Sequence, residues 1–251
     1  MTKTLMKQDG HMQAADALEG FVFIVTYGRS GSTLLQNVLN GIPGYLIRGE
    51  NDNILMHMAR SWVVANASPE IKIRREAMQS EGWRDPRYGS QIDPWFGAEL
   101  IRPDQMGRDL ADLFVRDVLR PEAGTRVTGF KEIRYHFAGD DMEAYFDFIL
   151  TFFPNSRLVF NTRNLNAVAR SGWWTEYTRE DFMAEVGDAD RRFRAYAASR
   201  PDRTILMHYD DYNGNVDAFR RLFEFLDEPF TRSYVAALAN QKLDHLKKKW
   251  K

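Results

Sequence analysis

Short apolar runs alternate with longer amphipathic stretches along most of the chain. The runs are rich in β-branched and aromatic residues and predict strands over residues 21–26, 44–48, 126–130, 157–161 and 203–208. Between the strands, helical periodicity predicts helices over residues 33–40, 53–65, 70–79, 106–119, 141–152, 164–175, 179–199 and 215–226. Strands that alternate with helices in this way predict an α/β fold, with a mostly parallel central sheet and helices on both faces.

One stretch interrupts this alternation. Residues 81–105 contain three prolines together with four aromatic residues, Trp83, Tyr88, Trp95 and Phe96. A long irregular segment inside a compact domain is usually functional or mobile. It is either a cover over a cleft or an aromatic-anchored surface loop. We expect a single domain over residues 21–251, with a substrate-covering insertion over residues 67–120, preceded by a flexible tail over residues 1–20.

Composition and charge narrow the class of protein. A chain of 251 residues with 44% hydrophobic content can bury a full core. The formal net charge of −1 gives no bulk attraction to nucleic acid or to anionic membranes, so an anion site has to be built locally. The absence of cysteine excludes disulfides and thiolate metal ligands and suits a reducing compartment.

No targeting or membrane segment is recognisable in the sequence. Residues 1–20 are polar and lack the apolar block of a signal peptide. No uninterrupted apolar run approaches the roughly 20 residues that span a bilayer. We therefore expect a cytoplasmic protein without a nucleic-acid partner, and its oligomeric state is not indicated.

The stretch GRSGSTLL, which follows the first predicted strand, is typical of an anion site. Gly28 and Gly31 permit a turn in which the amides of residues 30–33 converge on an oxyanion at the start of the next helix. The nucleoside triphosphatase signature has four residues between its first glycine and Gly-Lys-Ser/Thr. Here only Arg29 and Ser30 separate the glycines, and Ser32 stands in the place of the lysine. Ordinary kinase or ATPase chemistry is therefore disfavoured.

This loop resembles that of the sulfotransferases that use 3′-phosphoadenosine 5′-phosphosulfate (PAPS). Their loop has the form basic-Ser-Gly-Ser/Thr-Thr, which is matched here by Arg29, Ser30, Gly31, Ser32 and Thr33. A P-loop-type three-layer fold follows from the resemblance. It also implies PAPS as co-substrate, no metal ion, and sulfuryl transfer to a hydroxyl or amine of a small molecule or carbohydrate.

Two further stretches carry the same resemblance. In RLVFNTRNLNAVARS, Arg163 and Ser171 lie eight positions apart, as do the residues that hold the donor's 3′-phosphate in the family. An arginine offers a planar fork to a phosphate, and a serine two turns into the following helix adds a neutral donor. The segment ILMHYDDY resembles a late family segment that would place Tyr209 beside the adenine, with Asp210 and Asp211 bracing the local loop.

The resemblance also implies the catalytic residues. Glu50 follows Arg48 and Gly49 at a distance from the loop like that of the base in the tyrosylprotein and carbohydrate branches. The cytosolic branch uses a histidine instead, so His57 and His136 remain alternatives. Arg29 and Lys131 occupy family-like positions for cations near the transferring group. Glu132 could pair with Lys131 or Arg134, which would make the role of Lys131 structural.

Departures from the cytosolic branch keep other functions open. Its lysine-threonine-histidine motif is absent, and the end of the chain has no glycine-rich loop, although residues 247–249 are lysines. The competing hypotheses are a small-molecule kinase with a degenerate loop and a non-catalytic adenosine-bisphosphate-binding protein. The sequence does not identify the acceptor molecule. Tryptophan side chains could stack against a sugar ring or an aromatic alcohol, but they can equally anchor the core or a lid. The candidate side chains are Trp62, Trp83, Trp95, Trp173 and Trp174.

Overall fold

A sheet of five parallel strands forms the centre of the protein in a computed structural model that describes residues 18–79 and 90–239. The strand order is β2-β3-β1-β4-β5, and each neighbouring pair is parallel. The strands are β1 (Gly20–Val25), β2 (Tyr45–Arg48), β3 (Val127–Glu132), β4 (Ser156–Thr162) and β5 (Thr204–His208). All the predicted strands are present, with ends shifted by a residue or two, and the α/β fold is confirmed.

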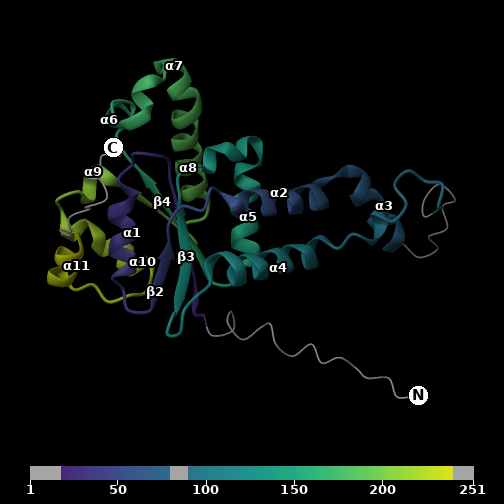
Figure 1. Cartoon of the computed structure of the whole chain (residues 1–251), viewed down its shortest axis with the longest axis horizontal. Coiled ribbons are helices and arrows are strands. Elements are labelled where there is room, and N and C mark those ends of the chain that lie inside the picture. The colour runs from purple at the N-terminus through teal and green to yellow at the C-terminus, as the bar shows by residue number, and fades with distance from the viewer. Residues whose placement is uncertain (1–17, 80–89, 240–251) are drawn as a thin grey trace, which may run out of the picture.

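Helices cover both faces of the sheet because the buried strands are apolar on both sides (Figure 1). Phe21, Phe23 and Val25 of β1 belong to one core cluster, whereas Val22 and Ile24 belong to the other. The second cluster lies under α1 (Ser32–Asn40), α10 (Arg220–Phe225) and α11 (Arg232–Ala239). The first lies under α2 (Ile54–Ala67), α4 (Pro103–Phe114), α5 (Met142–Phe152) and α8 (Asp188–Ser199). The helix α11 was not predicted from the sequence.

Part of the chain projects from the domain as an arm. Figure 1 shows α2 and α4 side by side, extending away from the sheet towards α3 (Pro69–Gln79). At α3, Arg74 and Asp93 form a buried ion pair with a 3.1 Å separation. Trp95 and Phe96, two of the four aromatic residues of segment 81–105, are largely exposed, and Trp83 and Tyr88 lie outside the described residues. The substrate-covering role of residues 67–120 remains a prediction.

The helix predicted over residues 164–175 is wrong in its second half. The helix α6 (Leu165–Ala169) ends early and is followed by the short turn η4 (Gly172–Glu176). Ser171 between them is extended, and Gly172 has a φ of +64°. A Cβ atom at Gly172 would lie 3.0 Å from the Arg29 side chain, so the close approach of Arg29 accounts for the glycine that ends the helix. Ser171 is therefore in a turn and not two turns into a helix.

The helix predicted over residues 179–199 is continuous but not uniform. It consists of α7 (Arg179–Phe182), the π turn η5 (Met183–Gly187) and α8. Another π turn, η2 (Val115–Leu119), extends α4. The turns η3 (Tyr135–Asp141) and η6 (Val216–Phe219), the short helix α9 (Tyr209–Tyr212) and the turn η1 (Ala98–Leu100) complete the elements described.

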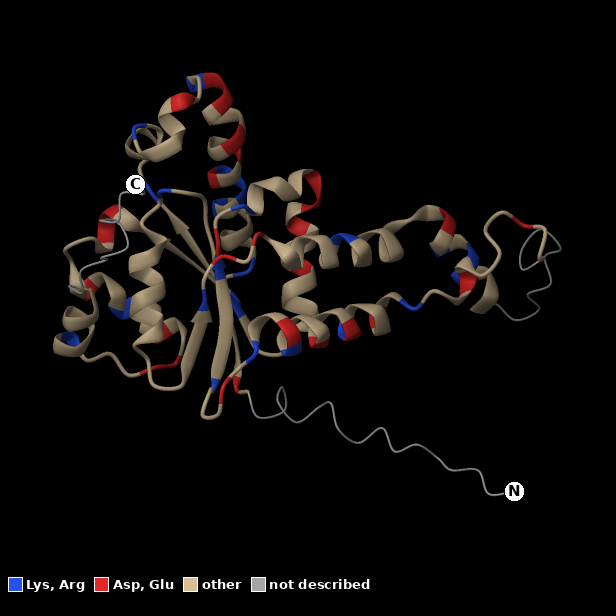
Figure 2. Cartoon of the chain, in the orientation of Figure 1, with Lys and Arg blue, Asp and Glu red and all other residues tan. Residues whose placement is uncertain are grey.

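Charges of both signs are interspersed over the whole ribbon (Figure 2). This distribution agrees with the near-zero net charge and leaves an anion site to be built by local geometry. Among residues 18–79 and 90–239, no helix combines the length and the apolar character needed to cross a bilayer.

Candidate functional site

The loop between β1 and α1 is anchored to β4 by buried hydroxyl groups. The Thr26 hydroxyl donates to the carbonyl oxygen of Asn161 over 2.7 Å, and the Ser30 hydroxyl lies 2.6 Å from that of Thr26. The Asn161 amide donates in turn to the carbonyl oxygen of Ser30. Because the Ser30 side chain is fully buried in this network, the loop presents its backbone to an incoming group.

The first turn of α1 is free to receive an anion. Gly31 precedes the helix in the left-handed region, with a φ of 79°, and gives it no side-chain cap. The first amides of a helix have no partner within the helix, and they carry the positive end of its dipole. The amides that follow Gly31, including those of Ser32 and Thr33, are therefore oriented as in anion-binding helix ends, and their binding role remains a prediction.

Arg163 lies directly after β4 and reaches back over this loop. Its Nη1 donates to the carbonyl oxygen of Arg29 over 3.0 Å, and its guanidinium lies 4.7 Å from the centre of the Tyr209 ring. The Nε of Arg163 is buried without a hydrogen-bond partner among the described residues. The Tyr209 ring also packs on Gly31, where an added Cβ atom would approach it to 2.1 Å. The ends of β1, β4 and β5 thus meet in one cluster.

Ser171 joins the same cluster through Arg29. The Nε of Arg29 donates to the Ser171 hydroxyl oxygen over 3.0 Å. The structure therefore brings together Arg29, Gly31, Arg163, Ser171 and Tyr209 at the carboxyl edge of the sheet, the edge at which open α/β folds bind ligands. Their individual roles remain predictions.

Tyr27 fixes the backbone of Arg163 in this cluster, and it was not singled out from the sequence. Its hydroxyl accepts from the Arg163 amide over 2.9 Å and donates to Asp190 over 2.8 Å. Burial and the neighbouring Asp190 raise the pKa of Tyr27 well above its ordinary value, so the phenol stays neutral. Asp210 accepts from the amide of Asn164 over 2.8 Å, which matches the bracing part expected of it. No local sequence signal marks Tyr27, because its partners are more than a hundred positions away.

Glu50 and Lys131 form an ion pair at the neighbouring strand ends. Lys131 is the penultimate residue of β3, and its Nζ contacts Glu50 Oε1. Arg134 Nη1 lies 3.7 Å from the other oxygen of Glu50. The lysine side chain is 8% exposed and that of Glu50 is 34% exposed, so the carboxylate is the accessible member.

Glu132, the alternative partner of Lys131, is engaged elsewhere. It is fully buried and accepts from the amides of Asn53 and Ile133 over 2.9 and 2.8 Å. Arg134 Nη1 also approaches it to 3.4 Å. Glu132 thus ties the loop after β2 to the loop after β3, which fixes Glu50 against Lys131.

An aromatic pocket of about 340 Å³ adjoins Glu50 and the β1–α1 loop. Trp173 packs on Gly28, where a Cβ atom would lie 2.2 Å from the indole, and the Trp174 Nε1 donates to the Gly28 carbonyl oxygen over 3.0 Å. We call this cavity the aromatic pocket; its lining is Gly28, Glu50, Ile133, Arg134, His136, Phe137, Trp173, Trp174, Tyr177 and Glu185. None of the described residues of segment 67–120 lines it.

Of the histidines considered as a base, His136 lines this pocket and His57 does not. His57 is exposed on α2. His136 Nε2 lies 2.9 Å from Glu185 Oε1. Burial, assisted by the Arg134 charge, lowers the pKa of His136 to about 4, and burial raises the pKa of Glu185. At neutral pH the imidazole is therefore neutral, and its contact with Glu185 is not an ion pair.

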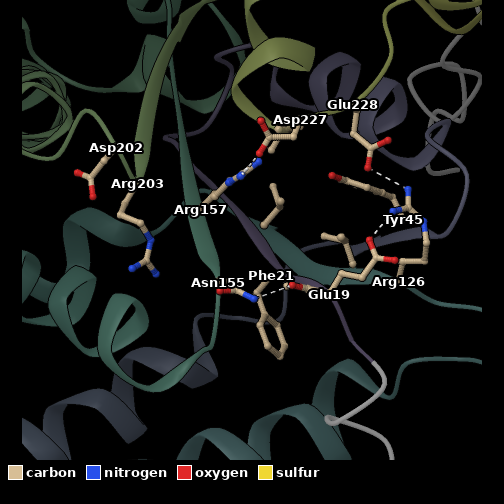
Figure 3. A pocket seen from close by; sticks show the side chains of 14 residues that line it. Glu19, Phe21, Tyr45, Arg126, Asn155, Arg157, Asp202, Arg203, Asp227 and Glu228 are labelled. Carbon is tan, nitrogen blue, oxygen red and sulfur yellow. Dashed lines mark hydrogen bonds and ion pairs between the residues drawn. The ribbon is translucent and has the colours of Figure 1, made fainter.

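A larger pocket, of about 460 Å³, lies at the opposite, amino edge of the sheet (Figure 3). Its charges are largely paired with one another: Arg157 contacts Asp227, and Arg126 contacts both Glu19 and Glu228. Parallel sheets place their chemistry at the carboxyl ends of the strands. The smaller aromatic pocket is therefore the better candidate for a reaction site.

Within residues 18–79 and 90–239, no group of three or more His, Cys, Asp or Glu side chains is arranged to hold a metal ion.

Comparison with known proteins gives one family. The family model described as "Sulfotransferase family" matches residues 22–232. None of the curated proteins compared with the chain matches it significantly.

Several solved structures also match the chain. The sulfotransferase domain from the Synechococcus PCC 7002 olefin synthase is 18% identical, with 98% of this chain and 87% of that chain covered and a TM-score of 0.48. The sulfotransferase domain from the curacin biosynthetic pathway is 17% identical, with coverages of 90% and 79% and a TM-score of 0.49. Sulfotransferase STF9 from Mycobacterium avium is 14% identical, with coverages of 95% and 71% and a TM-score of 0.40. Because these scores fall below 0.5, we draw no conclusion from the likenesses.

Proposed function

Because the chain belongs to the sulfotransferase family, we propose that it transfers a sulfuryl group from PAPS to a hydroxyl or amine of a small acceptor. One observation carries this proposal. Arg163 and Ser171, predicted to hold the 3′-phosphate, both contact Arg29 of the loop predicted to hold the 5′-phosphosulfate. A single bisphosphorylated nucleotide can therefore engage both groups at once.

The residues of the cluster suit an adenosine bisphosphate. The first amides of α1 bind the 5′ oxyanion, and the 3′-phosphate binds to the Ser171 hydroxyl and to Arg163 Nε, which has no partner among the described residues. The Tyr209 ring, which contacts Gly31 and the Arg163 guanidinium, is the aromatic group proposed to lie beside the adenine.

PAPS supplies an activated sulfuryl group, and the protein positions the acceptor and stabilises charge. Glu50, at the edge of the aromatic pocket, takes the proton from the acceptor hydroxyl. Lys131 holds this carboxylate in place and, with Arg29, neutralises charge that develops on the departing oxygen. The aromatic side chains of the pocket exclude water from the reacting atoms.

The nucleotide test compares two arginines at opposite ends of β4. Adenosine 3′,5′-bisphosphate should raise the melting temperature, whereas ATP with magnesium should not. Arg163→Ala should weaken bisphosphate binding by about ten- to a hundredfold, because it removes charge-assisted hydrogen bonds of roughly 1.5 to 3 kcal/mol. Arg157→Ala, which removes the contact with Asp227 at the amino edge, is the matched control and should bind normally. Stabilisation by ATP with magnesium alone would favour a kinase instead.

The role of Glu50 as the base is tested separately from nucleotide binding. Glu50→Gln should lower transfer of label from radiolabelled PAPS to a metabolite extract by roughly a hundredfold or more while bisphosphate binding stays intact. Asp52→Asn is the neighbouring control, because Asp52 also faces Arg134, at 3.4 Å, but its side chain is 87% exposed. If Glu50→Gln turns over like the parent protein, Glu50 is not the base.

A further inference from the structure

The aromatic pocket contains a second carboxylate that the proposed reaction does not use. Glu185 reaches the pocket from η5, a segment distant in sequence from Glu50. Its Oε1 lies 2.9 Å from His136 Nε2, and among the described residues no hydrogen bond to Glu185 is found. The side chain is 30% exposed, so a ligand in the pocket can reach it.

The charge of Glu185 is not compensated within the pocket. His136 is neutral near pH 7, because its pKa is lowered to about 4. Among the described lining residues, Arg134 supplies positive charge, but its Nη1 already lies within 3.4 to 3.7 Å of Glu50, Asp52 and Glu132. Burial raises the pKa of Glu185, which shows that its charged form is poorly solvated there. A cationic ligand would relieve this cost.

The walls of the pocket favour a flat molecule with a positive end. Trp174 packs edge-on against Tyr177 with ring centres 4.9 Å apart, and Trp173 lies 5.8 Å from Trp174. Phe137, Trp173 and Tyr177 are 56%, 45% and 42% exposed, so they present ring surface to a ligand. Aromatic faces attract planar rings and cations alike. An anionic ligand would instead meet two carboxylates, Glu50 and Glu185.

We propose that the acceptor is an aromatic amine with a hydroxyl group, whose ammonium group pairs with Glu185 while its hydroxyl lies at Glu50. This inference rests on the proposed function and adds the substrate class and a specificity-determining residue. Glu185 recognises the acceptor and takes no part in the transfer. A neutral ring of the same shape would contact the same aromatic side chains but would give Glu185 no cationic partner.

Three probes with one phenol ring and different charges test the proposal: tyramine, 4-ethylphenol and 4-hydroxyphenylacetate. Their binding is measured by calorimetry on protein saturated with adenosine 3′,5′-bisphosphate. Tyramine should bind about ten- to a hundredfold more tightly than 4-ethylphenol, because one charged hydrogen bond is added. The anionic probe should bind most weakly. Glu185→Gln, which removes the charge but keeps the size of the side chain, should reduce tyramine binding to the level of 4-ethylphenol and leave 4-ethylphenol unchanged.

The controls separate this inference from the proposed function. Glu180→Gln, an exposed carboxylate on α7 that does not line the pocket, should keep the preference for tyramine. Bisphosphate binding by the Glu185→Gln protein shows that it is folded. Equal affinity for the three probes, no binding of any probe, or an unchanged preference in Glu185→Gln would overturn the inference while the donor site stands. Failure of the parent protein to bind the bisphosphate would instead overturn the proposed function.

Discussion

At the scale of single residues, position 31 requires glycine for two reasons, backbone conformation and contact with Tyr209, and the two can be tested separately. Its φ of +79° disfavours any side chain, and a Cβ atom would also collide with the Tyr209 ring at 2.1 Å. Gly214 has nearly the same φ, +80°, but nothing lies within 4 Å of its added Cβ atom. The pair therefore separates backbone strain from the displacement of Tyr209.

We expect Gly214→Ala to lower the free energy of unfolding by about 1 kcal/mol, from left-handed backbone strain alone, and to bind adenosine bisphosphate normally. Gly31→Ala should lose more stability and also most of the bisphosphate-dependent rise in melting temperature. Urea unfolding and thermal shifts measure the two effects. If both variants bind the nucleotide equally, the Tyr209 ring does not form part of the donor site.

Residues in local motifs were predictable, and residues that act through distant partners were not. Arg29, Gly31, Arg163 and Ser171 stand in recognisable spacings, and the structure brings them together. Tyr27 and Glu185 have no such spacing, because their partners come from other strands or turns. Only the assembled sheet edge shows what these two side chains contact.

At the scale of elements, apolar strands were easier to predict than interrupted helices. A strand buried on both faces is a short apolar run, which has few other interpretations. The break after α6 depends on a contact between Gly172 and Arg29, which lie far apart in sequence. Helical periodicity over residues 164–175 does not reveal that contact, and the predicted helix was too long.

The contact between His136 of η3 and Glu185 of η5 makes stability depend on pH. The pKa of His136 is about 4 in the folded protein, below the ordinary 6.5 expected after unfolding. As the pH falls from 6.5 to about 4, His136 becomes protonated in the unfolded chain but stays neutral in the folded protein. The free energy of unfolding should therefore fall over this window, by up to roughly 3 kcal/mol from this group.

His136→Gln isolates this effect, because glutamine is polar and of similar size but does not titrate. The raised pKa of Glu185 works in the opposite direction and is present in both proteins, so the difference between them reports on His136. Urea unfolding at several pH values should give a shallower loss of stability on acidification for the variant. Identical pH profiles would mean that His136 is charged in the folded protein, as part of an ion pair with Glu185.

At the scale of the whole molecule, the arm and the donor site occupy different parts of the fold. The arm extends from the sheet through α2 and α4, whereas the donor cluster lies at the ends of β1, β4 and β5 (Figure 1). Arg74 and Asp93 near α3 form a pair in which the side chains are only 7% and 6% exposed. Asp93 also accepts from the Trp95 amide over 2.9 Å, so it organises the chain that returns towards α4.

Asp93→Ala should therefore destabilise the arm without affecting the nucleotide. Removal of one partner from a buried ion pair costs about 3 to 5 kcal/mol, because the remaining charge stays poorly solvated. Asp188→Ala, which removes contacts of a 41% exposed side chain with Arg191 and Arg192, should cost about 1 kcal/mol or less and serves as the control. Urea unfolding measures the loss, and the melting-temperature rise with adenosine bisphosphate measures the donor site. The rise should be the same in Asp93→Ala as in the parent protein. Its disappearance would show that the arm supports the donor site, whereas a separate early transition would show that the arm unfolds as a unit of its own.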